Sequence, residues 1–296
     1  MLESGGYDNY KGFTLLDSEW PTIAAAIPLF LQGENKRLQF LCRKLENFMN
    51  FYGRWDERLF LCLQAEECAV NANDANSAGW RSYRAGYTYY LRGMASEALS
   101  CACRAESYWR KSSAREKGFA IRLRGKINLL EKDYTAAMSA CQEVLTIRRA
   151  IKAESTDVAI ALNDLAEVER LSGDYPGAEL HYREALRIAR LVGFREGIAT
   201  YTGNLAELAL EHRDWLAAES LAREALALAE KVGRQESIAS DCSRLARSLS
   251  KQGRSLEGLP YAQRAVEIYT KLRHRDLVEA QAVLKECEEA AADKSG

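Results

Sequence analysis

The 296-residue sequence is poor in residues that favour strands or interrupt helices. It contains 9 valines and 11 isoleucines against 44 alanines and 37 leucines. Alanine and leucine lose little on entering a helix, whereas β-branched side chains favour strands. Only four prolines occur, where average usage would give about 15. These shortages exclude an all-β fold and disfavour a doubly wound α/β fold, so the sequence predicts an all-α protein.

The sequence also lacks the segments that lead to a membrane or out of the cell. No apolar run approaches about 18 residues, the length that begins to suggest a membrane span. The N-terminus has no basic segment followed by an apolar one, the pattern of a secretory signal. The formal net charge of −1 gives no overall attraction to nucleic acid or to an acidic membrane. We therefore expect a cytoplasmic protein that binds neither a membrane nor, directly, nucleic acid.

Motifs for catalysis and metal binding are missing too. The eight cysteines form no CxxC pair and lie in helical patterns, which indicates buried free thiols in a reducing compartment, with a disulfide or metal framework as the alternative. The three histidines are widely separated. No GxxxxGK[ST], GxSxG or HExxH motif occurs. We expect no enzyme activity, no catalytic or metal-binding residues and no cofactor.

A repeat of about 40 residues organises the chain. Three segments align without gaps: 160–197, 200–237 and 240–277. Three further copies precede them in the sequence, each shifted by about 40 residues from the next, so six copies are visible. Each copy reads as two helices, which cannot bury their apolar faces without neighbouring copies. The expected organisation is an N-terminal extension over 1–16, a lead-in helix over 17–33, a single solenoid over 34–291 and a tail over 292–296.

Capping and breaking residues mark the expected helix ends. Asp174 and Asp214 are candidate N-caps of second helices, and Gly233 is a candidate end. Pro28 and Pro260 fall inside predicted helices, where proline removes a hydrogen-bond donor. We expect these two prolines to kink or shorten their helices.

The repeat resembles that of the tetratricopeptide family. The likeness rests on leucine followed by a small residue in the first helix, as at Gly86, on the Gly-Asp-Tyr turn at 173–175, and on alanines such as Ala185 in the second helix. It implies an α-α superhelix of antiparallel helix pairs with a concave wall. The first copy departs from the pattern because Glu46 occupies the small-residue position.

A narrower resemblance lies near the start. The segments DSEWPTIAAAIPLFLQGE and FYGRWDERLFLCLQAE resemble the beginning of the C-terminal repeat region of STAND-type signalling NTPases. In that family a nucleotide switch of the NB-ARC or a related type precedes the repeats, which act as the sensor. The resemblance implies that this chain is such a sensor region.

The tetratricopeptide resemblance also implies which residues line the concave groove. Counting from the small residue at the centre of each first helix gives Arg43, Lys44, Asn47, Trp80, Tyr83, Arg84, Tyr87, Tyr90, Arg122, Lys126, Asn163, Asp164, Glu167, Arg170, Asn204, Glu207, Arg244 and Arg247. Charges along this set run from basic to acidic and back to basic. Solvated faces without a ligand are the alternative for these charges.

The groove residues suggest how a partner is held. The aromatic residues at 80, 83, 87 and 90 share one helix face, either as a binding platform or as part of the core. Asparagine amides can pair with both N–H and C=O groups of an extended peptide. We expect a non-enzymatic module that binds a protein or peptide, serving as the sensor or scaffold region of a bacterial signalling protein. The alternatives are a sensor for a small-molecule effector and repeats that hold an NTPase domain inactive.

Overall fold

The computed structural model describes residues 10–292 and shows fifteen α-helices, with no strand in that range. The fold class is all-α, of the tetratricopeptide-type superhelix, as the composition and repeats predict. The expected tail from 293 onward and the first nine residues of the expected N-terminal extension lie outside the described range. Within the described residues, no helix combines the length and the hydropathy that crossing a membrane requires.

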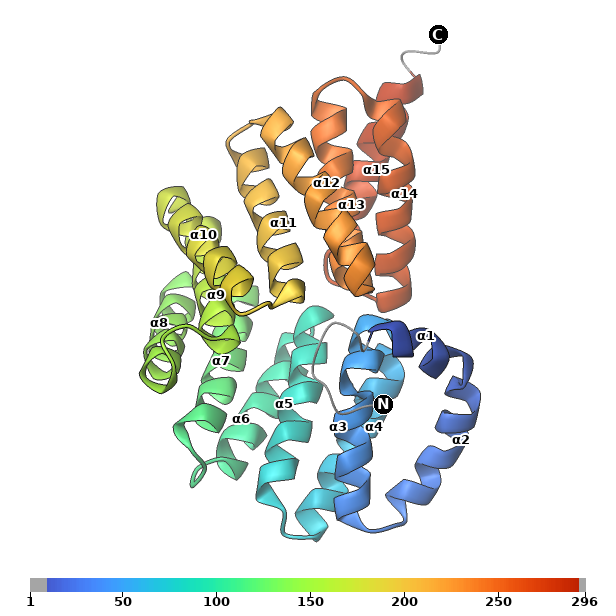
Figure 1. Ribbon diagram of the computed structural model, residues 1–296, viewed down its shortest axis with the longest axis vertical. Coiled ribbons are helices and arrows are strands. Elements are labelled where there is room, and N and C mark those ends of the chain that lie inside the picture. Colours follow the sequence, from blue (N-terminus) through green and yellow to red (C-terminus); the bar gives the residue numbers. More distant parts are fainter. Residues whose placement is uncertain (1–9, 293–296) are drawn as a thin grey trace. The chain divides into compact units, whose positions relative to one another are not determined.

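The chain divides into two compact units, Met1–Ile147 (unit 1) and Arg148–Gly296 (unit 2); the single solenoid over 34–291 stays a prediction. Unit 1, blue to green in Figure 1, holds α1 Tyr10–Ser18, α2 Trp20–Leu31, α3 Asn35–Phe51, α4 Trp55–Asn71, α5 Ala75–Leu91, α6 Ala95–Tyr108, α7 Ala114–Leu130 and most of α8 Tyr134–Ile151. Unit 2, yellow-green to red, holds α9 Thr156–Ser172, α10 Tyr175–Leu191, α11 Arg195–Glu211, α12 Trp215–Val232, α13 Gln235–Lys251, α14 Ser255–Leu272 and α15 Leu277–Ala292.

Helix hairpins build each unit. The first helices of the copies are α3, α5 and α7 in unit 1 and α9, α11 and α13 in unit 2, and each second helix follows its first helix in the chain. In unit 2 the first helices also contact one another directly, α9 with α11 and α11 with α13. The last helix, α15, packs on α13 and α14. First helices therefore form one continuous layer within this unit.

The start of the chain differs from the expectation. Residues 10–16 form part of helix α1 rather than an extension, and the segment 17–33 is shared between α1 and α2. Phe13 explains the extra helix, because its ring is buried and meets the rings of Phe48 and Phe51 edge-on at 5.8 and 5.9 Å. Burying this aromatic ring against α3 stabilises α1.

The predicted helix signals are largely confirmed. The Asp174 and Asp214 side chains accept hydrogen bonds from the backbone N–H groups of Gly177 and Ala217, at 3.1 and 3.0 Å, and so cap α10 and α12. Gly233 ends α12 in the left-handed conformation. Pro260 does not shorten α14, which has 18 residues, as many as α12, whereas α2, with Pro28 inside it, has 12. Packing of the repeat outweighs one lost hydrogen bond.

Small residues lie where helices approach closely, as the repeat phase predicts. A Cβ atom added to Gly86 would lie 2.7 Å from Leu123 Cδ2 and 2.8 Å from Cys101 Cβ, on α7 and α6. Ala185 and Ala225 in second helices are fully buried. All eight cysteines are free; Cys68 is half-buried, Cys103 is exposed and the other six are buried. The expectation of buried free thiols therefore holds for six cysteines and is wrong for Cys68 and Cys103.

Candidate functional site on the first helices

Four aromatic residues lie along one face of α5, and they differ in how deeply they are buried. Tyr83 and Tyr90 are each only 2% exposed and belong to the core. Trp80 and Tyr87 are half-buried. The Trp80 ring packs at 4.8 Å on Phe119 of α7, which fixes its orientation. The predicted platform therefore reduces to Trp80 and Tyr87, because the other two rings fill the space between α5 and its neighbours.

Cationic side chains lie over these rings. The Arg84 guanidinium is 5.5 Å from the ring centres of both Trp80 and Tyr83. Arg122 of α7 is 5.5 Å from the Tyr87 ring centre, and its Nη1 donates a hydrogen bond to the Tyr83 hydroxyl at 3.0 Å. Such contacts orient guanidinium groups and stabilise them by about 0.5–2 kcal/mol each. Lys126 also lies over an aromatic ring, that of Tyr90 at 5.8 Å, but is itself buried.

Beneath this layer lies a buried ion cluster that the sequence analysis did not predict. Glu46 of α3 accepts from Arg58 Nη2 at 2.8 Å and lies 3.4 Å from Arg84 Nε and 3.7 Å from Arg81 Nη1. Burial alone would raise the pKa of Glu46, but the charges of Arg84, Arg58 and Arg81 lower it to about 2. Arg58 also donates to the Thr88 hydroxyl. One carboxylate thus joins three arginines from α4 and α5.

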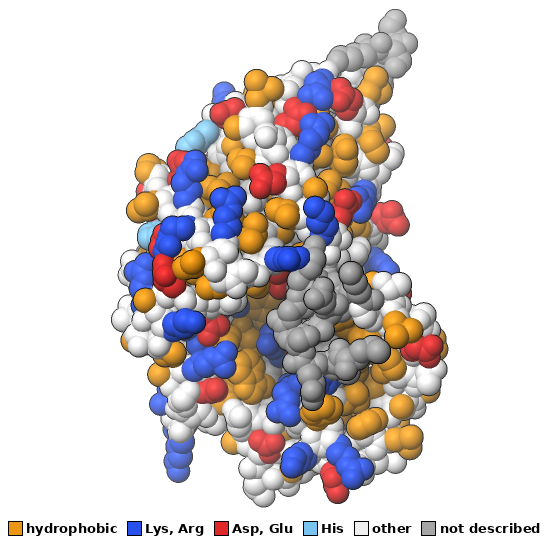
Figure 2. Space-filling view, in the orientation of Figure 1, with side chains coloured by type: hydrophobic (Ala, Val, Ile, Leu, Met, Phe, Trp, Pro, Cys, Tyr) orange, Lys and Arg blue, Asp and Glu red, His pale blue; other side chains and the backbone are white. Residues whose placement is uncertain are grey.

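The remaining predicted residues of unit 1 lie on α3. Arg43 and Asn47 are exposed and Lys44 is half-buried, with its ammonium group 5.2 Å from the centre of the Phe40 ring. Glu46 therefore belongs to the same helix as two solvent-facing cations. Figure 2 shows Lys and Arg side chains spread over the lower part of the molecule in this view, where Figure 1 draws α3 to α7.

In unit 2 the predicted residues form a hydrogen-bonded ladder. Asn204 donates through Nδ2 to Asn163 at 2.7 Å, and its Oδ1 accepts from Arg244 Nη2 at 3.2 Å. Arg244 Nε and Arg247 Nη1 both donate to Glu207, at 3.1 and 2.7 Å. The amide of Asn204 is thus engaged within the protein rather than available to clamp a peptide backbone.

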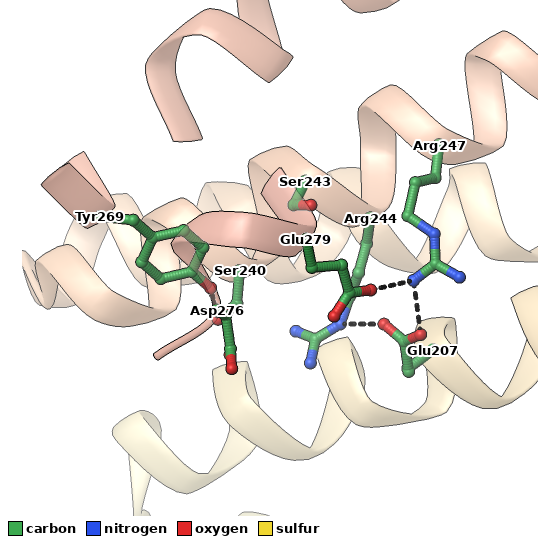
Figure 3. Close-up of a pocket in the computed structure, with 8 residues that line it drawn as sticks. All are labelled: Glu207, Ser240, Ser243, Arg244, Arg247, Tyr269, Asp276 and Glu279. Carbon is green, nitrogen blue, oxygen red and sulfur yellow. Dashed lines mark hydrogen bonds and ion pairs between the residues drawn. The ribbon is translucent and has the colours of Figure 1, made fainter. Parts of the chain in front are cut away.

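A small polar pocket of about 50 Å³ opens beside this ladder. Figure 3 shows Glu207 reaching toward Arg244 and Arg247, with Glu279 of α15 meeting the same end of the Arg247 guanidinium. Burial tends to raise the pKa of Glu207, but the neighbouring Arg244, Arg247 and Arg170 lower it to about 2. The lining is completed by Ser240, Ser243, Tyr269 and Asp276.

Gly203 makes room for a buried ion pair behind the pocket. Arg244 Nη1 donates to Asp241 Oδ1 at 2.8 Å. A Cβ on Gly203 would lie 2.8 Å from that same Nη1 and closer still to Asp241 Oδ1. Asp241 is 1% exposed, and burial raises its pKa to about 7 despite Arg244. The absence of a side chain at 203 thus has a packing cause.

The other predicted residues of unit 2 are paired or buried. Arg170 lies 3.2 Å from Glu211 and Glu167 lies 3.7 Å from Arg275. Asp164 is buried. Acidic and basic residues of this face therefore neutralise one another across neighbouring helices, so the predicted alternation of charge does not leave separate patches in unit 2.

Groups for covalent or metal chemistry are not assembled in the described part of the chain. Between residues 10 and 292, no group of three or more His, Cys, Asp or Glu side chains is arranged to hold a metal ion. Burial raises the pKa of Cys42 to about 12 and that of Cys62 to about 11, with smaller opposing effects from Arg81. At neutral pH these thiols are protonated and weakly nucleophilic.

Comparison with known sequences agrees with the repeat architecture. The sequence profile described as "Tetratricopeptide repeat" matches residues 119–191, which span α8, α9 and α10 together with most of α7. No curated protein matches the sequence significantly.

Solved structures share the fold over much greater lengths. A Rap protein complexed with Competence and Sporulation Factor matches with a TM-score of 0.59 and 14% identity, covering 86% of this chain and 76% of that one. BtubC from P. vanneervenii matches with a TM-score of 0.54 and 17% identity, covering 73% and 91%. Residues 119–191 thus match the tetratricopeptide repeat in sequence, and the chain shares the fold of these solved structures.

A third structure is a STAND protein with a tetratricopeptide repeat sensor from Pyrococcus horikoshii. It matches with a TM-score of 0.56 and 13% identity, covering 98% of this chain but 48% of that one. This chain thus spans about half the length of the Pyrococcus protein. At this identity the likeness shows the fold.

Proposed function

We propose that this chain is a non-enzymatic interaction module whose first-helix face in unit 1 binds a protein or peptide. The observation that carries the proposal is the half-buried pair Trp80 and Tyr87 lying beneath Arg84 and Arg122. Aromatic and arginine side chains together are the residues that contribute most at protein interfaces. The Rap structure contains a factor bound to a protein of this fold, which supports the same use of the fold here.

The test combines capture with substitution. The full chain is used as bait, and a captured protein is identified by mass spectrometry, purified and titrated against the chain. The double variant Tyr87→Ala with Arg122→Gln is expected to weaken binding at least about tenfold, since interface residues of this type each contribute more than about 1 kcal/mol. Unchanged affinity in a folded double variant would refute the assignment of the face.

We further propose that the chain serves as the sensor or scaffold region of a larger cytoplasmic signalling protein of the STAND type. The support is the likeness to the Pyrococcus protein over 98% of this chain, together with the resemblance at residues 17–34 and 51–66. The reading frame upstream of Met1 tests it. A nucleotide-binding P-loop encoded there is expected, and an upstream sequence without one would contradict the proposal.

The unit 2 pocket is a poor fit for a small-molecule effector. Pockets that hold drug-sized ligands usually have volumes of roughly 300–1,000 Å³, whereas the unit 2 pocket has about 50 Å³. Its arginines already bind Glu207. This volume suits the tip of one side chain rather than a whole effector molecule.

A further inference from the structure

The first helices of unit 1 carry a large surplus of positive charge. Eleven lysines and arginines lie on α3, α5 and α7, against two acidic residues, Glu46 and Glu116. The second helices α4 and α6 of the same unit carry six acidic residues against two arginines. The surplus therefore belongs to the first helices of the unit and is hidden by the net charge of −1. Within it, however, Arg81 and Lys126 are buried and Arg124 pairs with Glu106 of α6.

The Glu46 cluster contributes to this surplus. Its single carboxylate is shared by three guanidinium groups, so the cluster keeps two positive charges. Arg84 is the member that reaches solvent, with 34% of its side chain exposed. Arginine presents several N–H donors in a plane that suits a carboxylate. A partly exposed guanidinium backed by two buried ones attracts an anion more strongly than an isolated surface arginine.

The first helices of unit 2 provide the contrast. The three helices α9, α11 and α13 carry nine acidic residues against five basic ones. There Glu207 is held by two arginines, and the Asn163–Asn204–Arg244 ladder joins neighbouring helices. The first helices of unit 2 therefore have a net negative charge and their Arg170, Arg244 and Arg247 are engaged with carboxylates, whereas the first helices of unit 1 have a net positive charge that is complementary to an anion.

We propose that the first-helix face of unit 1 binds an acidic segment of a partner protein, with carboxylates facing Arg84 and Arg122. The proposal rests on the interaction function proposed above and names the chemistry of the partner. Charge complementarity steers association and selects partners. Neighbouring apolar side chains of the segment would pack on the exposed edges of Trp80 and Tyr87.

A polyanion of another class, single-stranded nucleic acid, fits the face less well. Bases bind such surfaces by stacking on the open faces of aromatic rings. Here Arg84 lies over Trp80 and Arg122 lies over Tyr87, and Trp80 also packs on Phe119. These contacts compete with stacking, whereas a carboxylate needs only the guanidinium groups.

The test uses fluorescence anisotropy with a labelled oligoglutamate peptide, an oligolysine peptide and oligothymidylate, each titrated with the full chain. We expect oligoglutamate to bind, with affinity falling as salt rises, and oligolysine to bind at least about fivefold more weakly. The triple variant Lys44→Gln, Arg84→Gln and Arg122→Gln is expected to lose about tenfold in affinity for oligoglutamate.

The matched control removes three arginines from second helices of unit 2, Arg183→Gln, Arg223→Gln and Arg264→Gln. It changes the net charge equally and is expected to alter affinity less than about twofold, because exposed charges outside the first-helix face are screened by salt. The double variant Arg43→Gln with Lys44→Gln lies outside the Glu46 cluster. It is expected to weaken the binding of oligoglutamate about threefold, and it replaces the triple variant as the test if the triple variant does not fold.

Three results would overturn the acidic-partner proposal: no binding of oligoglutamate, equal losses in the control and the triple variant, or tighter binding of oligothymidylate than of oligoglutamate. If oligoglutamate fails to bind while a captured protein still binds through Tyr87, the preference for an acidic partner is refuted but the proposed interaction function is supported. If oligoglutamate fails to bind and the captured protein also stays bound after substitution of Tyr87 and Arg122, both the acidic-partner proposal and the proposed interaction face are refuted.

Discussion

Arg58 Nη2 and Glu46 Oε1 are 2.8 Å apart in the interior of unit 1, where the arginine side chain is 1% exposed. The pair joins α3 to α4 at the position where other copies of the repeat carry a small residue. Arg81 and Arg84 complete the arrangement from α5. An ion cluster, rather than close packing of small residues, therefore connects α3 and α4 to α5. The cluster also leaves a net positive charge on the face that we propose binds a partner.

Replacing the central carboxylate should destabilise the protein. Glu46→Gln leaves three arginines without their shared counter-charge, and removing one partner of a buried ion pair costs about 3–5 kcal/mol. Denaturant unfolding of the full chain measures this loss. Glu67→Gln, on the exposed surface of α4, is the control and should change the free energy of unfolding by less than about 0.5 kcal/mol. Equal effects of the two substitutions would contradict the role of the cluster.

The buried carboxyl of Asp241 predicts a dependence of stability on pH. Its pKa is raised by burial from 3.8 to about 7, so between these values the folded state holds a proton that the unfolded state releases. Protonation therefore stabilises the folded state as pH falls from 7 toward 4, and this gain is lost as pH rises through 7.

Asp241→Asn cannot gain this proton and provides the comparison. The free energy of unfolding of the unsubstituted chain, measured relative to that of Asp241→Asn, should be greater at pH 5 than at pH 8 by roughly 2 kcal/mol. Urea unfolding at the two pH values measures the difference. A constant difference between the two proteins would show that burial does not raise the pKa of Asp241.

Gly86 tests the packing of the repeat. Gly86→Ala places a methyl group against Leu123 and Cys101 and should lower the free energy of unfolding by about 1–3 kcal/mol through overpacking. Gly12→Ala is the matched control, because an added Cβ there meets nothing within 4 Å; alanine should leave stability unchanged or slightly raise it. Similar effects at both glycines would mean that Gly86 does not mark a close helix contact.

The sequence alone predicts the fold well because the repeat fixes it. Periodic small residues such as Gly86 and Ala185 report helix contacts directly, and capping residues such as Asp174 act on their own helix turn. The sequence pattern therefore predicts both the helix contacts of the repeat and the capped helix ends.

The candidate site is less predictable because it depends on neighbouring helices. Offsets from the small residue place Tyr83 and Tyr90 on the groove face, but the packing of α5 on its neighbours buries both rings. In the sequence, Glu46 appears only as a departure from the small-residue pattern. The signal that could have identified its cluster was present nonetheless, since an acidic residue at a core position requires cationic partners, and Arg58, Arg81 and Arg84 follow in the next two helices.

The most direct test of the central claim is amide hydrogen exchange of the full chain with and without its captured partner. Binding to the first-helix face of unit 1 predicts slower exchange in α5 and α7, residues 75–91 and 114–130, because a bound segment suppresses local opening there. Exchange in the second helices α12 and α14 should be unchanged. Protection confined to those second helices, or absent from α5 and α7, would contradict the account.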